Sequence, residues 1–158
     1  MMRSLEVLGL VPVLREALDR GVPYFGICLG MHALYERSEE APTWPGLGVL
    51  RGAVRRFPEG LKVPHMGWNQ LKIVPESRLF DGIAPGPFVY FAHSYYVPME
   101  DSAASVPEGR AAMCDYGRPF VAAIERTNLW ATQFHPEKSG DPGLRILENF
   151  VRASRKGV

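Results

Sequence analysis

The chain has few cysteines and no long apolar run, and both absences narrow the class of protein. Only two of its 158 residues are cysteines, Cys28 and Cys114, and they lie in unrelated sequence contexts. This is too few for a small secreted fold built on disulfides. No apolar run approaches the roughly 20 residues that cross a bilayer, and Glu6 interrupts the N-terminal apolar stretch that a signal peptide would need. We therefore expect a cytoplasmic protein with no membrane contact.

The chain also lacks a charge excess and any metal-ligand pattern. Eighteen basic residues face 17 acidic ones, for a net charge of +1, and pairs such as Arg55 and Arg56 form no basic stripe. This balance argues against nucleic acid as a partner. The four histidines show neither the His-x-x-x-His spacing of a helix nor a paired Cys-x-x-Cys. We expect no metal and no cofactor.

The composition and the hydrophobic pattern indicate one α/β domain. Hydrophobic residues make up 46% of the chain and charged residues 22%, which is enough apolar content for a core. Helical and strand-like segments alternate and are separated by Gly, Pro, Asp and Asn turns. The pattern predicts helices over 4–8, 12–20, 29–35 and 143–153, and strands over 22–27, 47–57, 71–74, 88–92, 111–114, 121–125 and 129–134. In the last helix, Leu144, Leu147 and Phe150 have the spacing of an apolar face.

The segment Gly26-Ile27-Cys28-Leu29-Gly30 is the first candidate for chemistry. It joins a buried strand to a helix, and a glycine on each side of Cys28 would permit a sharp turn like the nucleophile elbow of Gly-x-Ser-x-Gly hydrolases. The thiol would then lie at a helix N-terminus, where free N–H groups and the helix dipole favour the reactive thiolate. Taken alone, this pentapeptide also fits a buried cysteine in a tight turn, with no chemistry.

A second segment, Gln133-Phe134-His135-Pro136-Glu137, follows another apolar run. His135 lies where the predicted strand meets a loop, and Pro136 prevents the strand from continuing. Glu137 is placed to accept the ring N–H and to leave the other nitrogen free as a base for Cys28. A histidine after a strand is also compatible with a purely structural role. The thiol, imidazole and carboxylate together predict a cysteine hydrolase with the triad Cys28, His135 and Glu137.

Jointly, these motifs resemble the class I (triad) glutamine amidotransferases, and within them the glutaminase subunit of imidazole glycerol phosphate synthase. The resemblance runs along nearly the whole chain. It rests on residues 24–31 (Tyr-Phe-Gly-Ile-Cys-Leu-Gly-Met), 36–40 (Glu-Arg-Ser-Glu-Glu), 64–69 (Pro-His-Met-Gly-Trp-Asn), 91–97 (Phe-Ala-His-Ser-Tyr-Tyr-Val) and 133–139 (Gln-Phe-His-Pro-Glu-Lys-Ser). It implies a flavodoxin-like α/β fold with a mostly parallel sheet flanked by helices.

The resemblance also implies a reaction and a substrate site. Cys28 would attack the carboxamide of glutamine, His135 would protonate the departing ammonia, and water would release glutamate from the thioester. The backbone N–H of Leu29 would stabilise the oxyanion. The positions that match the family's substrate-binding residues are Gly30, His32, Glu40, Ser94 and Tyr95.

His32 is a departure, because the family usually has glutamine at this position. A histidine can hydrogen-bond the same substrate group through one ring nitrogen, with a different reach and with titration near neutral pH. The alternative is that His32 only packs on the elbow helix. Glu40 likewise has two readings, as the partner of the substrate ammonium or as a solvated acid beside Glu39.

The resemblance implies a partner as well, a TIM-barrel cyclase that receives the ammonia without its release into water and forms a heterodimer with the glutaminase for histidine biosynthesis. Met66 and Trp68 are predicted interface residues in a Pro/Gly-framed loop, with core packing as the alternative. Lys138 matches a family position that pairs with an acid of the cyclase. The next residues, 140–143 (Gly-Asp-Pro-Gly), depart from the family's pattern.

The start of the chain also departs from the family. Members begin with a strand, a helix, two strands and a Pro-Gly-rich loop, whereas Met1 falls where the helix after that loop begins. The expectation is a single domain over 1–158 that lacks N-terminal strands and one oxyanion donor, a loss that can cost about 10² to 10³ in turnover. Two alternatives to the glutaminase therefore stay open: a non-catalytic binding module, and another class I glutaminase, for example one serving anthranilate or pyridoxal phosphate synthesis.

Overall fold

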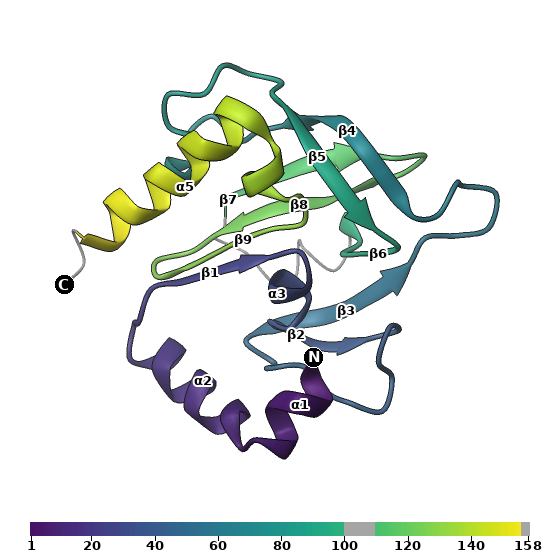
Figure 1. Cartoon of the computed structure of the whole chain (residues 1–158), viewed down its shortest axis with the longest axis vertical. Helices are drawn as coiled ribbons and strands as arrows, with labels where there is room; N and C mark the ends of the chain where they lie inside the picture. Colours follow the sequence, from purple (N-terminus) through teal and green to yellow (C-terminus); the bar gives the residue numbers. More distant parts are fainter. Residues whose placement is uncertain (100–109, 156–158) are drawn as a thin grey trace.

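The computed structural model describes residues 1–99 and 110–155, and its largest element is a six-stranded sheet (Figure 1). The strand order is β1-β9-β8-β7-β4-β5. The strands are β1 (Tyr24–Ile27), β4 (His65–Lys72), β5 (Phe88–His93), β7 (Arg110–Asp115), β8 (Pro119–Glu125) and β9 (Leu129–Thr132). Short turns connect β7 to β8 and β8 to β9, so these neighbours run antiparallel. Only β1 and β9 pair in parallel within this sheet.

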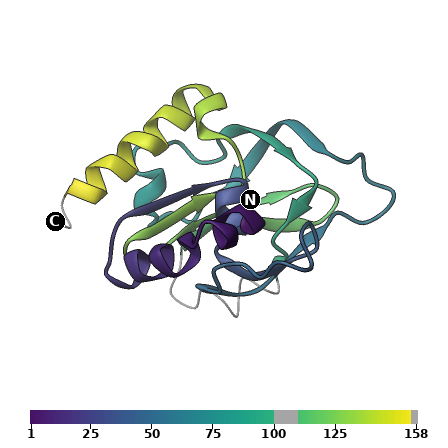
Figure 2. The same cartoon turned by 60° about the horizontal axis from the view of Figure 1, so that its bottom comes forward.

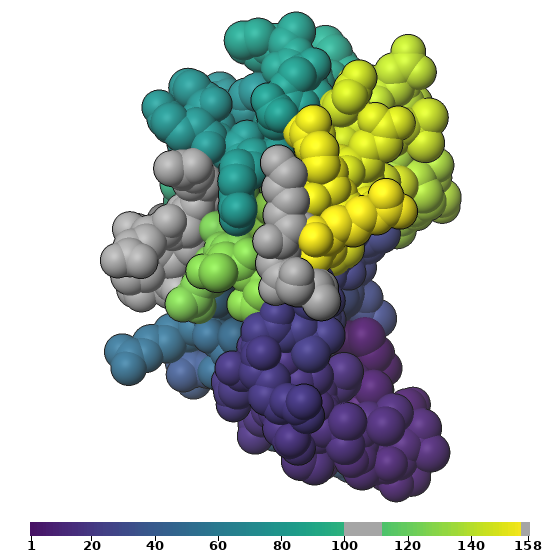
Figure 3. Space-filling view, turned by 90° about the vertical axis from the view of Figure 1, so that its left-hand side faces the viewer, coloured from purple at the N-terminus to yellow at the C-terminus, as the bar shows by residue number. Residues whose placement is uncertain are grey.

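A smaller sheet and four helices complete the described fold. The order of the smaller sheet is β2-β3-β6, formed by β2 (Tyr35–Ser38), β3 (Leu50–Arg56) and β6 (Tyr95–Tyr96). The helices are α1 (Met2–Val7), α2 (Leu10–Asp19), α3 (Leu29–His32) and α5 (Gly140–Arg155), with short 3-10 turns η1 (Arg78–Phe80) and η2 (Pro136–Lys138). Helices α1 and α2 lie at one end of the molecule and the β4–β5 tip lies at the other (Figures 1 and 3).

The large sheet separates two hydrophobic cores, because successive side chains of a strand point to opposite faces. Val121 and Ile124 of β8 and Ala131 of β9 face one core, which also contains residues of α1, α2, α3 and the smaller sheet. Val121 and Ile124 share this face because the pairing of β7 with β8 shifts register between them. The adjacent residues Phe120 and Trp130 face the other core, together with Ile146 of α5. Figure 2 shows α5 lying along this second face. The strand pattern of the sequence is therefore that of a sheet covered on both sides.

Two histidines lie inside the second core as a hydrogen-bonded pair. His65 of β4 stands opposite His93 of β5 in the strand register, and both are almost completely buried. The His65 Nδ1 and the His93 Nε2 are 2.9 Å apart, and the His93 Nδ1 is 2.8 Å from the Tyr95 carbonyl oxygen. Since that carbonyl only accepts, the His93 Nδ1 carries a proton and His65 donates to the His93 Nε2. The pair is thus satisfied in its neutral form.

The predicted α/β class is confirmed, while several details of the prediction were wrong. The sheet is not mostly parallel among the described strands, because hairpin connections produce antiparallel neighbours. The helix predicted over 29–35 ends at His32, and Tyr35 already belongs to β2. The loop predicted over 64–69 is largely strand β4. On α5, Leu144 is exposed and the buried residues are Gly143, Ile146 and Asn149.

Other local predictions agree with the structure. The helix predicted over 12–20 ends at Asp19, and Gly21 has a φ of +80° that suits a residue just after a helix. Cys114, at the end of the strand predicted over 111–114, lies buried in β7. Over residues 1–99 and 110–155, the structure has no helix that is long and apolar enough to span a membrane.

Candidate active site

The parallel pair β1 and β9 brings the two predicted catalytic segments together. Ile27 at the end of β1 is in register with Thr132 at the end of β9, and the Cys28 N–H donates to the Thr132 carbonyl oxygen at 2.7 Å. Cys28 follows β1 directly, and His135 lies three residues beyond β9. Since the carboxyl ends of parallel neighbours meet at one edge of a sheet, residues more than a hundred positions apart share one site.

Cys28 occupies a strained turn between β1 and α3. Its φ of +49° and ψ of −101° make it the one non-glycine residue with positive φ in the described part of the chain. Backbone conformations of this kind are costly and gather at functional sites. Gly26 serves a different purpose, because a Cβ on it would lie 2.8 Å from the backbone of Gly30. The glycines thus permit close approach of strand and helix, while the cysteine itself makes the predicted turn.

The surroundings of the Cys28 thiol correct one electrostatic expectation. Partial burial raises the pKa of the thiol, and the charges of Glu40 and Glu137 raise it further. Hydrogen bonds from the Leu29 backbone N–H and from the Gln133 side chain oppose this rise in the pKa. Helix α3 is only four residues long, so its dipole is small and does not outweigh burial. A thiolate therefore needs a base or a bound substrate.

His135 and Glu137 make the predicted hydrogen bond. The His135 Nδ1 lies 2.7 Å from the Glu137 Oε1. The two residues are two positions apart, and the short turn η2, which begins at Pro136, brings their side chains together. A carboxylate only accepts, so Nδ1 carries the proton and Nε2 keeps its lone pair. The His135 backbone N–H is fixed by the Tyr90 carbonyl oxygen at 2.9 Å. This arrangement leaves one ring nitrogen free to act as a base.

A cavity of about 290 Å³ adjoins the elbow, and Leu29, His32 and Glu40 contribute to its lining. The His32 Nδ1 is buried, has no hydrogen-bond partner among the described residues and lies 3.9 Å from the Glu40 Oε2. The His32 ring lowers the pKa of the Glu40 carboxyl, against the opposing effect of partial burial. Glu40 is thus a carboxylate at the cavity, which suits a cationic group of a ligand. A larger cleft of about 690 Å³ lies at η1 and α5 and includes none of the predicted site residues.

Gln133 is a member of the site to which the sequence analysis assigned no role. Its side chain is fully buried, accepts a hydrogen bond at Oε1 from the His32 Nε2 at 2.8 Å and donates from Nε2 to the Cys28 Sγ at 3.6 Å. It therefore connects the thiol to His32. Its place in the motif before His135 was the available signal, although no residue type or spacing singles out this contact.

Ser94 and Tyr95 follow the end of β5. Burial is the main cause of the lowered pKa of neighbouring His93, and positive charge on His65, His32 or His135 would lower this pKa further, so this end of β5 lies within electrostatic range of the site. Ser94 accepts the Phe57 N–H at its carbonyl oxygen, and Tyr95 pairs with Arg56 of β3. Gly30 accepts a hydrogen bond from the Tyr24 hydroxyl at its carbonyl oxygen. Substrate contacts of Gly30, Ser94 and Tyr95 stay predictions.

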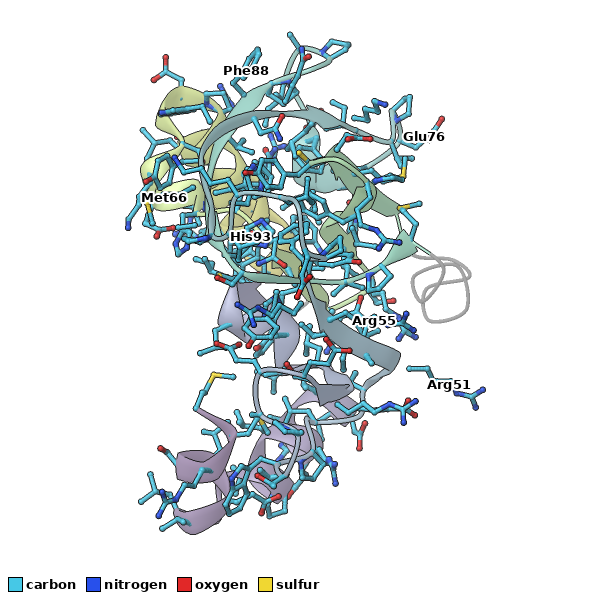
Figure 4. The ribbon with its side chains drawn as sticks, turned by 90° about the vertical axis from the view of Figure 1, so that its right-hand side faces the viewer. Arg51, Arg55, Met66, Glu76, Phe88 and His93 are labelled. Atoms are coloured by element: carbon cyan, nitrogen blue, oxygen red, sulfur yellow. The ribbon has the colours of Figure 1, made fainter. Side chains whose placement is uncertain are left out.

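Met66 and Trp68 are exposed rather than part of the core, with exposed fractions of 65% and 56%. They point outward from β4 because His65, Gly67 and Asn69 alternate with them toward the interior. Figure 4 shows Met66 at the margin of the molecule and His93 inside it. Phe88 of β5 is also exposed, and Tyr90 makes an edge contact with the Trp68 ring. We call Met66, Trp68, Phe88 and Tyr90 the hairpin patch.

Lys138 ends η2, next to the triad segment, and its side chain is exposed.

The cross-strand register places the members of the hairpin patch on one face, with Trp68 opposite Tyr90 and Phe88 opposite Gln70. The sequence does not indicate Phe88 and Tyr90 as interface residues, because only the pairing of β4 with β5 brings them beside Trp68. In residues 1–99 and 110–155, no group of three or more His, Cys, Asp or Glu side chains has the geometry of a metal site.

Comparison with known proteins decides the family. A model of the class I glutamine amidotransferase family matches residues 3–153. The subunit HisH of imidazole glycerol phosphate synthase from Aquifex aeolicus is 47% identical over 155 residues, which are 98% of this chain and 72% of that protein. The HisH subunit from Deinococcus radiodurans is 52% identical over 144 residues, 89% of this chain and 64% of that protein. The chain belongs to the class I glutamine amidotransferases, in the HisH family.

Solved structures agree with this amidotransferase fold. A crystal structure of a glutamine amidotransferase superposes with a TM-score of 0.71 at 20% identity, and covers 99% of this chain and 73% of its own. A putative GMP synthase subunit from Thermoplasma acidophilum gives a TM-score of 0.66 at 19% identity, over 96% of this chain and 67% of its own. At these identities the likeness concerns the fold alone.

Proposed function

We propose that this chain is the glutaminase subunit of an imidazole glycerol phosphate synthase. The observation that carries the proposal is the meeting of Cys28 with the His135–Glu137 pair at the ends of two parallel strands, in a chain about half identical to HisH subunits. The substrate is glutamine, and the products are glutamate and ammonia for a cyclase subunit. Residues 1–158 act as one amidotransferase domain in this proposal.

The reaction follows from the roles of the three side chains. The Cys28 Sγ attacks the carboxamide carbon of glutamine after the free Nε2 of His135 takes the thiol proton. The oxygen that becomes negative in this step lies within reach of the Leu29 backbone N–H, which already contacts the sulfur. His135 returns its proton to the departing ammonia. Water then attacks the thioester, and glutamate leaves.

The cavity beside the elbow is the proposed place for the amino-acid end of glutamine. Glu40 is ionised there and attracts the α-ammonium, and the buried Nδ1 of His32 lies 3.9 Å from that carboxylate. Gly30, Ser94 and Tyr95 are the other proposed substrate contacts. The lowered pKa of Glu40 helps the site keep its negative charge at neutral pH.

The hairpin patch is the proposed interface with the TIM-barrel cyclase. Large apolar side chains that remain exposed on one face of a hairpin are typical of protein contacts. Lys138 is the proposed charged contact beside the triad, and the heterodimer would pass ammonia directly to the cyclase. Both cysteines are free thiols, which fits the proposed cytoplasmic location.

The test is a Cys28→Ala variant assayed with the cyclase subunit. We expect it to lose glutamine-dependent synthesis of imidazole glycerol phosphate and to keep synthesis from added ammonium, because only the nucleophile is absent. Cys114→Ser is the matched control, since Cys114 lies buried in β7 and outside the site. Glutamine-dependent synthesis by Cys28→Ala would contradict the proposal. Absence of glutamate release by the wild-type chain would favour a binding module instead.

A further inference from the structure

The carboxamide of Gln133 lies between the Cys28 thiol and the ring of His32. Its Nε2 is 3.6 Å from the Cys28 Sγ, and its Oε1 is 2.8 Å from the His32 Nε2. Gln133 is fully buried and His32 is 6% exposed, so water does not easily replace either contact. Gln133, which follows β9, thus joins His32 of α3 to Cys28 of the elbow through two successive hydrogen bonds.

The direction of these two hydrogen bonds depends on which nitrogen of the His32 ring carries a proton. A carboxamide has an accepting end and a donating end of nearly equal size, so packing alone does not select one orientation. Because Oε1 only accepts, the observed contact requires a proton on the His32 Nε2. If that nitrogen were bare, it would attract the NH2 group, and the carboxamide oxygen would turn toward the sulfur.

The orientation matters because the thiol has few groups that favour its ionised form. Burial and the carboxylates of Glu40 and Glu137 all raise the pKa of Cys28. The groups that lower this pKa are the Leu29 backbone N–H and the Gln133 side chain. A reversed carboxamide would replace one of two favourable donors by a lone pair facing the sulfur.

We propose that His32 is a positioning residue, which acts through Gln133 by holding the carboxamide with its NH2 group toward the Cys28 sulfur. The role deepens the proposed function, since it rests on Cys28 as the nucleophile. It concerns the free enzyme and is separate from any contact of His32 with substrate. The fully buried Gln133 is the transmitting group.

The experiment measures the reactivity of the Cys28 thiolate without glutamine or cyclase. The rate of alkylation by iodoacetamide is followed from pH 6 to 10, and peptide mass spectrometry separates Cys28 from the buried Cys114. The variants are Gln133→Leu, which removes the donor, and His32→Phe, which removes the orienting N–H. Because no substrate is present, loss of glutaminase activity for other reasons leaves the readout intact.

We expect Gln133→Leu to lower the alkylation rate below the pH midpoint about tenfold, the usual effect of losing one hydrogen bond to a charged group. His32→Phe should shift the midpoint in the same direction, because no N–H then holds the carboxamide oxygen of Gln133 away from the sulfur. A His32→Phe profile equal to that of wild type would overturn the proposal.

A measurement on the unmutated protein covers the case in which a variant does not fold. Nitrogen-15 chemical shifts of the His32 ring report which nitrogen carries a proton. The proposal requires a protonated Nε2 across the pH range in which Cys28 is alkylated. A neutral ring protonated only at Nδ1 would refute it.

Discussion

The buried pair of His65 and His93 predicts a steep loss of stability in mild acid. Burial lowers the pKa of His65 to about 4 and that of His93 to about 3, and positive charge on His65 further lowers the pKa of His93. An unfolded histidine has a pKa of about 6.5. Below that pH the two histidines bind protons in the unfolded chain but stay neutral in the folded chain. Stability is therefore complete above about pH 7 and falls as the pH decreases toward 4.

The size of the effect follows from proton linkage. At pH 5 the unfolded state gains about 2 kcal/mol from each histidine, because its protonated form outweighs the neutral form about 30-fold. Together the pair removes about 4 kcal/mol from the free energy of unfolding between pH 7.5 and 5. This is a large share of the 5 to 15 kcal/mol, roughly, that a domain of this kind has.

Urea unfolding at several pH values measures this loss, with tryptophan fluorescence as the readout. A His65→Asn/His93→Asn double variant is the matched control: Asn can donate where each Nδ1 donates, yet it does not titrate. The variant should be less stable at pH 7.5, since His65 stacks on Phe91 and Tyr116, but its stability should depend much less on pH. Equal slopes of unfolding free energy against pH in both proteins would refute the reasoning.

Three further predictions concern single side chains. Trp68→Ala should weaken binding to the cyclase by about 2 kcal/mol in a titration with an unchanged melting temperature of the free chain, whereas a lowered melting temperature would favour a core role. Gly26→Ala should lower the free energy of unfolding in urea by about 2 kcal/mol or more, because the new Cβ would lie 2.8 Å from the Gly30 backbone. A Gly26→Ala variant as stable as the wild type would contradict this prediction. Glu125→Gln should cost about 2 kcal/mol, because this buried carboxylate accepts from the Ser77 hydroxyl and the Leu79 N–H, and an unchanged unfolding midpoint would rule out its anchoring role.

Local sequence patterns were sufficient where the physics is local. The glycines around Cys28, the two-residue spacing of His135 and Glu137 and the stop after the second helix all concern neighbours in the chain. A glutamate two residues from a histidine reaches its ring on almost any short turn, and the 2.7 Å contact is the result. The exposed or buried state of a β4 residue does not follow from local pattern alone, because alternation is visible only once a strand is assigned, and the prolines and glycines near residues 64–69 predict a loop there.

The sequence by itself determined the family and the α/β class and predicted the triad residues, because motifs and hydrophobic periods depend on residues that are near one another in the chain. Only the tertiary structure decided which distant groups meet. The parallel pairing of β1 with β9 joined Cys28 to Gln133, and the β4–β5 register placed Phe88 and Tyr90 in the hairpin patch and buried His65 against His93. These contacts depend on strand pairing between remote segments, which no local propensity specifies.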